Sequence, residues 1–388
     1  MTEYLLIAAL PVAAYAGWWL ARTIQRKSSN KKNRLFSSQY FQGLNYLLNE
    51  QPDKAIEVFL ELADVNEDTV ETHMALGNLF RRRGEVDRAI RFHQNIIAKE
   101  RLKPEQRTRA LLELGEDYMR AGLLDRAEVL FSELIESDSH TPPALRSLLE
   151  IYQQEKDWAE AVEQARRLEK ITGEHMGDVM AQFCCEMAQD ALDAGNREDV
   201  RRHLRQARRH HPECVRSRLI VARLCELEEN FEGAMDAYEE VASLDTDYVA
   251  DIIGPYLKIA KQAGMEKRCR EQLESWKEDY DGITLTLKIT EFLAQEKGNE
   301  EAGQYLIDVL SNKPSVRGLD HLIDMSREGY LPAGSGDDIL KAVTSRLLQR
   351  EPRYRCSHCG FSGLTHHWQC PSCKRWSTTK TIHGVLGE

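Results

Sequence analysis

The segment 111–131, LLELGEDYMRAGLLDRAEVLF, carries the residue spacing that decides the fold of this chain. A small residue, Gly115, precedes an aromatic one, Tyr118, by three positions, and Ala127 follows nine positions later. Small residues let two antiparallel helices approach closely, and aromatic side chains fill the space beside the next pair. Gly122 falls at the predicted turn, where a residue that tolerates a left-handed backbone is useful. The segment therefore predicts a helix–turn–helix unit.

The same spacing occurs further up the chain and predicts an array of stacked helix pairs. Gly43 and Gly77 stand where Gly115 stands, so successive units begin 34 and 38 residues apart. A period in this range is typical of tetratricopeptide repeats, which the chain resembles. Weaker copies, marked by small and aromatic residues in the same order, continue beyond the third. We predict an all-α tetratricopeptide solenoid over residues 35–350, with about eight to nine helix pairs and a degenerate final pair over 319–349.

Such an array presents a concave groove that is lined by the first helix of each pair. A groove of this kind can bind an extended peptide or a helix of a partner protein. In the second and third copies we expect six side chains to face it: Asn78, Arg81, Arg82, Arg109, Glu116 and Arg120. For each of these residues the alternative is an ordinary solvated helix face.

Residues 351–388 carry the most specific chemical motif, two Cys-x-x-Cys pairs separated by ten residues: Cys356, Cys359, Cys370 and Cys373. Each pair curls the backbone so that both sulfurs point at one position, and two pairs supply the four thiolates of a tetrahedral metal site. Four protein ligands leave no position for water or substrate, so we expect a structural or docking role. Tetrathiolate coordination suits both zinc and iron, and the motif leaves the choice between them open.

This cysteine-rich tail, residues 351–388, is too short to fold by burial alone. We expect metal binding to supply the folding free energy, with short strands around Tyr354 and over 376–382. Four aromatic residues are predicted to form a small core: Tyr354, Phe361, Trp368 and Trp376. Because four cysteines complete the site, we expect three nearby histidines at the surface and not on the metal: His358, His366 and His367.

The N-terminus predicts a single-pass membrane anchor over residues 1–21. Residues 4–21, YLLIAALPVAAYAGWWLA, contain no charge. A helix of this length spans roughly 27 Å, enough for a bilayer core. Six basic residues follow within 22–34, a predicted basic juxtamembrane linker, so the positive-inside rule predicts an N-terminus outside the cytoplasm and a cytoplasmic body. A cleaved signal peptide is the alternative, although its basic residues normally precede the apolar run.

Charge and sequence motifs limit the function classes. The formal net charge is −11, and because the first 34 residues carry a net +5, the rest of the chain is strongly acidic. An acidic body opposes bulk binding of nucleic acid, whose phosphates require a positive surface. The sequence contains no zinc-protease, phosphate-binding-loop or serine-hydrolase signature, so we predict that the protein is not an enzyme.

One predicted helix carries a dense basic stripe: Arg201, Arg202, Arg205, Arg208 and Arg209, with His210 and His211. We interpret the stripe as a solvated face balanced by acids such as Glu198 and Asp199, and anionic lipid, RNA or an acidic partner is the alternative. Five cysteines lie outside the tail in mostly apolar helical contexts. We predict that they are reduced core residues: Cys184, Cys185, Cys214, Cys225 and Cys269.

In combination, these features resemble the lipopolysaccharide assembly protein B family of Gram-negative inner membranes. The most specific part is the tail, with YRCSHCGF at 354–361 and WQCPSCKRW at 368–376. The resemblance implies a regulatory adaptor that presents the lipid A pathway deacetylase to a membrane-anchored AAA+ protease. It also implies placement of the single-pass anchor in the inner membrane with a periplasmic N-terminus, and a response to an inner-membrane sensor protein through that anchor. Help in organising lipopolysaccharide assembly and metal binding by the four tail cysteines are implied as well.

Two other function classes stay open. The cysteine pairs resemble those of rubredoxins, which carry iron, so a rubredoxin-like electron-transfer protein is one alternative, although the ten-residue spacer is shorter than theirs. A nucleic-acid-binding scaffold is the other, and it would use the basic residues of the tail: Arg353, Arg355, Lys374, Arg375 and Lys380.

Overall fold

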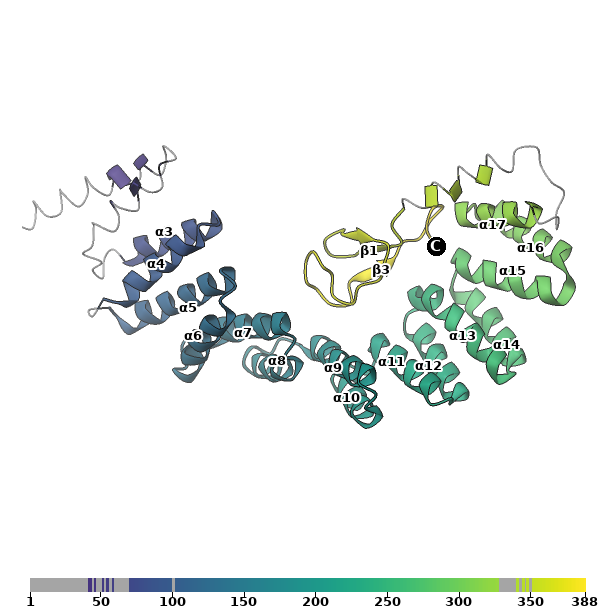
Figure 1. The fold of residues 1–388 in the computed structure, drawn as a ribbon, viewed down its shortest axis with the longest axis horizontal. Helices are drawn as coiled ribbons and strands as arrows, with labels where there is room; N and C mark the ends of the chain where they lie inside the picture. The colour runs from purple at the N-terminus through teal and green to yellow at the C-terminus, as the bar shows by residue number, and fades with distance from the viewer. Residues whose placement is uncertain are drawn as a thin grey trace, which may run out of the picture. The chain divides into compact units, whose positions relative to one another are not determined.

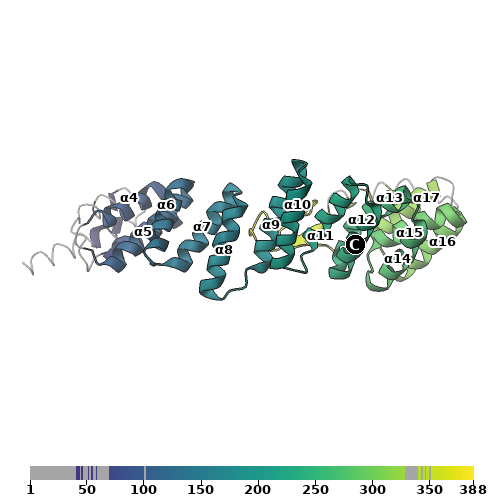
Figure 2. The same cartoon turned by 90° about the horizontal axis from the view of Figure 1, so that it is seen from below.

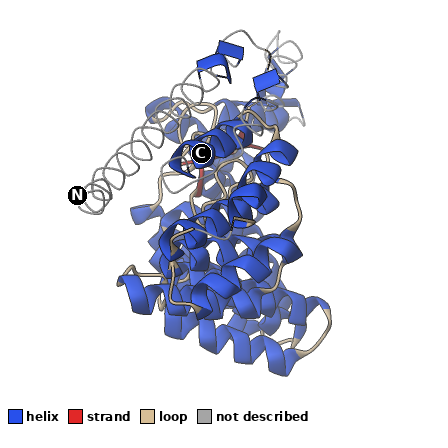
Figure 3. Ribbon diagram, turned by 90° about the vertical axis from the view of Figure 1, so that its left-hand side faces the viewer, coloured by secondary structure: helices blue, strands red, loops and turns tan. Residues whose placement is uncertain are grey.

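The computed structural model describes residues 41–43, 45–46, 51, 54–55, 58, 70–99, 102–327, 340–341, 344–345, 347–348 and 351–388. Figure 3 shows that helices dominate this part of the chain and that the strands form only a small element. The chain divides into two compact units between residues 151 and 152, called unit 1 and unit 2. The predicted all-α repeat fold with a small C-terminal domain is confirmed. The predicted anchor and basic linker, residues 1–34, lie outside the described residues.

Unit 1 contains α3 (Val70–Arg82), α4 (Val86–Ile97), α5 (Pro104–Arg120), α6 (Leu124–Glu136) and most of α7 (Thr141–Glu155). The first helices of unit 2 are α8 (Trp158–Thr172), α9 (Gly177–Asp193), α10 (Arg197–His210), α11 (Val215–Leu227) and α12 (Phe231–Leu244). A short 3₁₀ helix and five α-helices follow: η1 (Thr246–Tyr248), α13 (Val249–Ala263), α14 (Glu266–Asp279), α15 (Ile283–Lys297), α16 (Asn299–Asn312) and α17 (Val316–Arg327). Within unit 2, successive helices follow one another as antiparallel pairs (Figure 2).

The spacing that predicts the repeat has a steric basis in unit 1. A Cβ atom at Gly77 would lie 2.5 Å from the His93 ring, and one at Gly115 would lie 2.6 Å from the Phe131 ring. Both glycines therefore allow the second helix of a pair to approach the first closely. Gly122, between α5 and α6, has a φ of +74°, the left-handed conformation that glycine adopts without steric cost.

The tail folds as a three-stranded antiparallel sheet in the order β2-β1-β3, made of β1 (Tyr354–Cys356), β2 (Ser362–Gly363) and β3 (Thr379–Thr381). Tyr354 pairs with Gly363 on one side and with Thr381 on the other. The predicted short strands are thus confirmed. The sheet lies beside α9, α11 and α13 of unit 2 (Figure 1). Trp368 of the tail packs against a hydrophobic cluster that residues of α11 to α15 form.

None of the helices within the described ranges is long and apolar enough to cross a membrane.

Candidate metal centre

The four tail cysteines converge on one point. The Sγ atoms of Cys356 and Cys373 are 3.8 Å apart, those of Cys359 and Cys370 are 3.7 Å apart, and all four lie within 4.8 Å of one another. A tetrahedron with metal–sulfur bonds of about 2.3 Å has sulfur–sulfur edges of about 3.8 Å. The sulfur positions therefore fit one tetrahedrally bound metal ion, and they fit zinc and iron alike.

Two similar backbone turns bring the sulfurs together. In the first, the Cys356 N–H donates to the Phe361 carbonyl (2.7 Å) and the Gly360 N–H donates to the Cys356 carbonyl (3.0 Å). In the second, the Cys370 N–H donates to the carbonyl of Arg375 and the Lys374 N–H donates to that of Cys370, both at 2.9 Å. Gly360 and Lys374 take left-handed φ values of 77° and 58° at matching places. The two turns thus form a pair of matching knuckles.

The surroundings of Cys356 favour its thiolate, the form that binds metals. The Thr378 hydroxyl lies 3.2 Å from the Cys356 sulfur, and this hydrogen bond, together with those from the backbone of Cys359 and His358, lowers the pKa of Cys356 to about 6. Cys356 and Cys370 are buried, whereas Cys373 is half-buried and Cys359 is exposed. The site therefore has one protected side and one side near solvent.

The predicted aromatic core of the tail is largely a docking surface for the helices. The Trp376 ring lies 6.2 Å from that of Trp158 and 5.9 Å from that of Phe183, both edge-on, and its indole N–H donates to the Gln153 side chain (3.1 Å). The expectation of a self-contained core is wrong for Trp376, because its ring packs on α8 and α9. Pairing of the tail with the helices explains how so small a segment buries its aromatic side chains.

A second aromatic contact corrects the expectation for His366. Trp368 stacks on Tyr248 of η1, with ring centroids 5.6 Å apart, and the Arg216 guanidinium lies 5.5 Å from the Trp368 ring. His366 lies between the rings of Tyr248, Tyr354 and Trp368 at 4.6–5.6 Å. Burial lowers the pKa of His366. The residue is thus a half-buried interface side chain, and not the surface residue that we expected.

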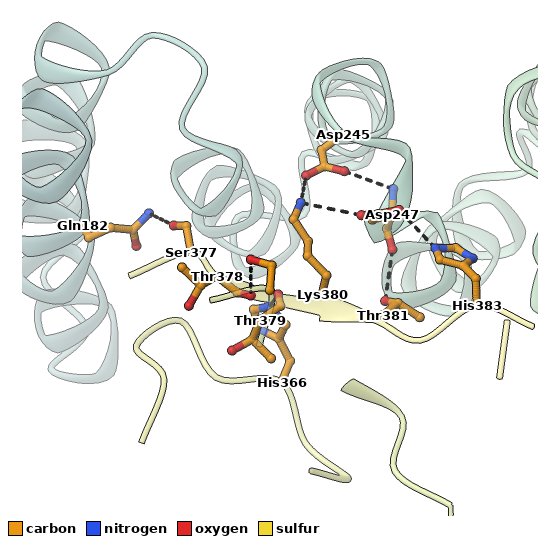
Figure 4. Close-up of polar contacts among 11 residues, drawn as sticks. Gln182, Asp245, Asp247, His366, Ser377, Thr378, Thr379, Lys380, Thr381 and His383 are labelled. Carbon is orange, nitrogen blue, oxygen red and sulfur yellow. Dashed lines mark hydrogen bonds and ion pairs between the residues drawn. The ribbon is translucent and has the colours of Figure 1, made fainter. Parts of the chain in front are cut away.

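Polar contacts fix the position of β3 along the helices (Figure 4). Lys380 forms an ion pair with Asp245, and its Nζ lies 3.7 Å from an Asp247 carboxylate oxygen. His383 Nε2 lies 3.1 Å from the other Asp247 oxygen, and the Tyr354 hydroxyl donates to Asp251 (2.5 Å). An acidic segment of unit 2, residues 245–251, therefore binds a basic segment of the tail.

Glu388 fixes the far end of the tail on unit 2. We refer to the contact surface between the tail and the helices of unit 2 as the dock. The Glu388 carboxylate accepts hydrogen bonds from the Thr284 N–H (3.1 Å) and hydroxyl (2.7 Å) and from the Tyr280 hydroxyl (3.3 Å). It also forms an ion pair with Arg317 of α17. Gln153 lies among the last residues of α7, which belong to unit 2. The tail therefore contacts unit 2 from the end of α7 to α17.

The residues of unit 2 that contact the tail were not identified from the sequence. The polar ones are spread over residues 153–284 and form no recognised motif: Gln153, Gln182, Asp245, Asp247, Asp251 and Thr284. One signal was available, because 245–251 contains three acids and 353–380 is rich in bases.

The six predicted groove residues occupy different environments in unit 1. Arg81 of α3 donates to Glu113 (2.7 Å) and to Asp117 (2.9 Å) of α5. Asp117 is fully buried and also contacts His93 of α4 (2.5 Å), so one carboxylate joins three helices. These contacts give Arg81 a structural role.

The other groove predictions stay predictions. Arg82 and Arg120 are exposed. Arg109 pairs with Glu71 at the surface, and Glu116 accepts a hydrogen bond from Ser147 (3.1 Å). Asn78 is half-buried and hydrogen-bonded to Glu113.

The basic stripe on α10 is partly neutralised. Arg201 pairs with Glu228, and Arg202 pairs with Asp199 (2.8 Å). These pairs agree with the interpretation of the stripe as a solvated, charge-balanced face.

Known families match both parts of the chain. A rubredoxin metal binding domain matches residues 354–380, and tetratricopeptide repeats match residues 72–105, 112–174 and 185–248. Among solved structures, a tetratricopeptide repeat protein from Parabacteroides merdae shares 14% identity with a TM-score of 0.33, covering 72% of this chain and 99% of that one.

Curated relatives match almost the whole length. Lipopolysaccharide assembly protein B of Escherichia coli K12 is 34% identical over 99% of both chains. The protein of the same name from Haemophilus influenzae is 32% identical over 97% of this chain and 98% of its own. At this identity over nearly its full length, the chain belongs to the lipopolysaccharide assembly protein B family.

Proposed function

We propose that this protein is a membrane-tethered, non-enzymatic adaptor in lipopolysaccharide assembly. The observation that carries the proposal is the 34% identity to a protein of that name over 99% of both chains. The helical repeats add support, since such arrays present extended surfaces for protein partners. The uncharged run at residues 4–21 supports a tether at the inner membrane.

In its finer form, the proposal is that the adaptor presents the lipid A pathway deacetylase to a membrane-anchored AAA+ protease. An adaptor with two binding surfaces turns a weak encounter between substrate and protease into a nearly intramolecular one, because it raises their effective concentration. Tethering to the membrane restricts the search further. An inner-membrane sensor protein would act through the anchor, at residues 1–21.

The four tail cysteines would hold one iron or zinc ion in this proposal. The ion would supply folding free energy to the tail, and the tail would in turn hold the helices of unit 2 through the Trp376 and Glu388 contacts. Visible absorbance and metal analysis of the purified protein distinguish the two metals. A reversible change in iron absorbance on reduction would favour the electron-transfer alternative.

A crosslinked affinity purification from native membranes tests the adaptor role. The full chain is compared with a chain lacking residues 1–21 and with the double variant Arg82→Glu/Arg120→Glu, which alters two exposed arginines of the predicted groove. The double variant Arg83→Glu/Arg107→Glu, which alters two exposed arginines outside the predicted set, is the matched charge control.

We expect the deacetylase and the protease with the full chain and the control, less of both with the truncated chain, and loss of at least one with the double variant. Recovery of neither enzyme with the full chain, and of redox or RNA-binding proteins in their place, would contradict the proposal.

A further inference from the structure

Two cysteines outside the metal centre lie in contact beneath the tail. Cys185 belongs to α9, and Cys214 is the residue that precedes α11. Their Sγ atoms are 3.8 Å apart, and both residues are buried, with 0% and 2% of their surface exposed. A disulfide bond requires a sulfur–sulfur distance of about 2.05 Å. The sulfurs are in contact but roughly 1.8 Å farther apart than in a bond, so bond formation requires the two side chains to rotate toward each other.

Cys214 differs chemically from the ordinary core cysteines of this chain. A hydrogen bond from Cys185 lowers the pKa of Cys214 to about 7 against the effect of burial, with help from the Ser217 backbone and hydroxyl and the Arg216 charge. Burial raises the pKa of Cys184 to about 12 and that of Cys269 to about 11. The thiolate is the form that reacts with oxidants. Cys214 should therefore be oxidised more readily than Cys184 or Cys269.

The residues around Cys214 are the same residues that hold the tail. The Gln182 amide lies 3.8 Å from the Cys214 sulfur and donates to the Ser377 hydroxyl at 3.0 Å (Figure 4). Arg216, whose charge helps to lower the pKa of Cys214, lies over the Trp368 ring. A movement of Cys214 therefore disturbs two contacts of the dock at once.

We propose that Cys185 and Cys214 form a reversible redox modification site whose oxidant is a peroxide, and that its oxidation weakens docking of the tail. The Cys214 thiolate attacks a peroxide oxygen, the O–O bond breaks, and a sulfenic acid forms; the hydroxide that leaves takes up the proton that the thiol had lost and becomes water. The Cys185 thiol then displaces the sulfenic hydroxyl as a second water, and the S–S bond forms. The two thiols lose two electrons and two protons in total, hydrogen peroxide takes up both, and a thiol reductant restores the pair.

The docked tail and the oxidation of the pair oppose each other in this arrangement. Gln182, which binds Ser377 of the tail, lies 3.8 Å from the Cys214 sulfur, so a peroxide reaches the pair more readily when the tail lifts away. Once formed, the disulfide pulls Cys214 toward α9 and displaces the side chains that hold Ser377 and Trp368. This inference does not depend on the identity of the adaptor's partners.

The test uses the metal-loaded full chain in detergent micelles, treated with hydrogen peroxide and digested without reduction for mass spectrometry. We expect a Cys185–Cys214 cross-linked peptide that disappears on reduction and in Cys214→Ser, and that persists in Cys184→Ser and in Cys269→Ser. Weakening the dock with Lys380→Ala should speed formation of the cross-link at least fivefold. Its absence in the wild-type chain, or its formation by Cys184 in place of Cys185, would overturn the assignment.

The effect on docking has a separate readout. Hydrogen exchange over residues 366–383 should rise at least threefold after oxidation and return to its starting value after reduction. Unchanged exchange in protein that carries the cross-link would overturn the coupling to the tail.

Discussion

Units 1 and 2 hold their helices together in different ways. In unit 1, Asp117 of α5 contacts Arg81 of α3 and His93 of α4, so one buried carboxylate links neighbouring helices. In unit 2, the tail contacts α7 at Gln153, α9 at Gln182, α13 at Asp251 and α15 at Thr284. The buried carboxylate joins adjacent repeats, whereas the tail contacts many repeats at once.

The difference has an energetic consequence. Removing a local link should destabilise only the helices that it joins. The tail depends on its own fold, which is too small to persist without further support. The stability of unit 2 should therefore respond to the metal centre, and that of unit 1 should not.

The largest expected effect comes from removing one thiolate. Structural zinc contributes about 10–16 kcal/mol to the folding of small domains at neutral pH, so Cys356→Ser should unfold the tail and not merely loosen it. Metal content and protease sensitivity of residues 351–388 report the result. Cys269→Ser removes an equally buried cysteine on α14 and serves as the control. A Cys356→Ser protein with stoichiometric metal and a resistant tail would contradict this expectation.

Removing the buried carboxylate of unit 1 should cause the next largest loss of stability. Asp117→Ala leaves Arg81 and His93 without their shared partner, and removing one member of a buried ion pair costs about 3–5 kcal/mol. Hydrogen exchange should rise over α3 to α5 and stay unchanged in the tail. Glu116→Ala, at a half-buried neighbouring position, is the control and should cost about 1 kcal/mol or less. Equal effects of the two variants would remove the special role of Asp117.

Removing the main aromatic contact between the tail and unit 2 should cause a smaller loss of stability. Trp376→Ala removes the ring that packs on Trp158 and Phe183, and anchors of this kind contribute about 2–4 kcal/mol to an interface. The tail should keep its metal but exchange hydrogen faster at the Tyr354 and Lys380 contacts. Leu364→Ala, at an exposed tail position, should leave both properties unchanged. Metal loss in Trp376→Ala would instead place this ring in the fold of the tail itself.

The smallest effect is a pH dependence confined to unit 1. Burial alone would raise the pKa of Glu113, but hydrogen bonds from Arg81 and Asn78 outweigh it and hold the pKa below the ordinary 4.5. The ionised carboxylate therefore stabilises the fold above pH 4.5, and this contribution is lost as the pH falls through the lowered pKa. Glu113→Gln should destabilise α3 to α5 at pH 7, measured by hydrogen exchange. A difference from the wild type that fails to shrink below pH 4.5 would contradict the assignment.

The local features of the fold could be predicted from the sequence because they depend on short spacings. Gly77 and Gly115 specify helix pairs by steric fit, and the cysteine spacing specifies two turns whose sulfurs converge. The dock could not be predicted in the same way. The Trp376–Gln153 bond joins residues 223 positions apart, and a tryptophan beside a metal site looks the same whether it packs inside the tail or on another element.

The central claim is that the metal-organised tail holds the helices of unit 2 together. Hydrogen exchange of the full chain, with and without a chelator strong enough to remove the metal, tests it most directly. We predict faster exchange in the tail and in α8, α9, α13 and α15, with exchange in α3 to α5 unchanged. Loss of protection in the tail alone, with the helices of unit 2 as protected as before, would contradict the account.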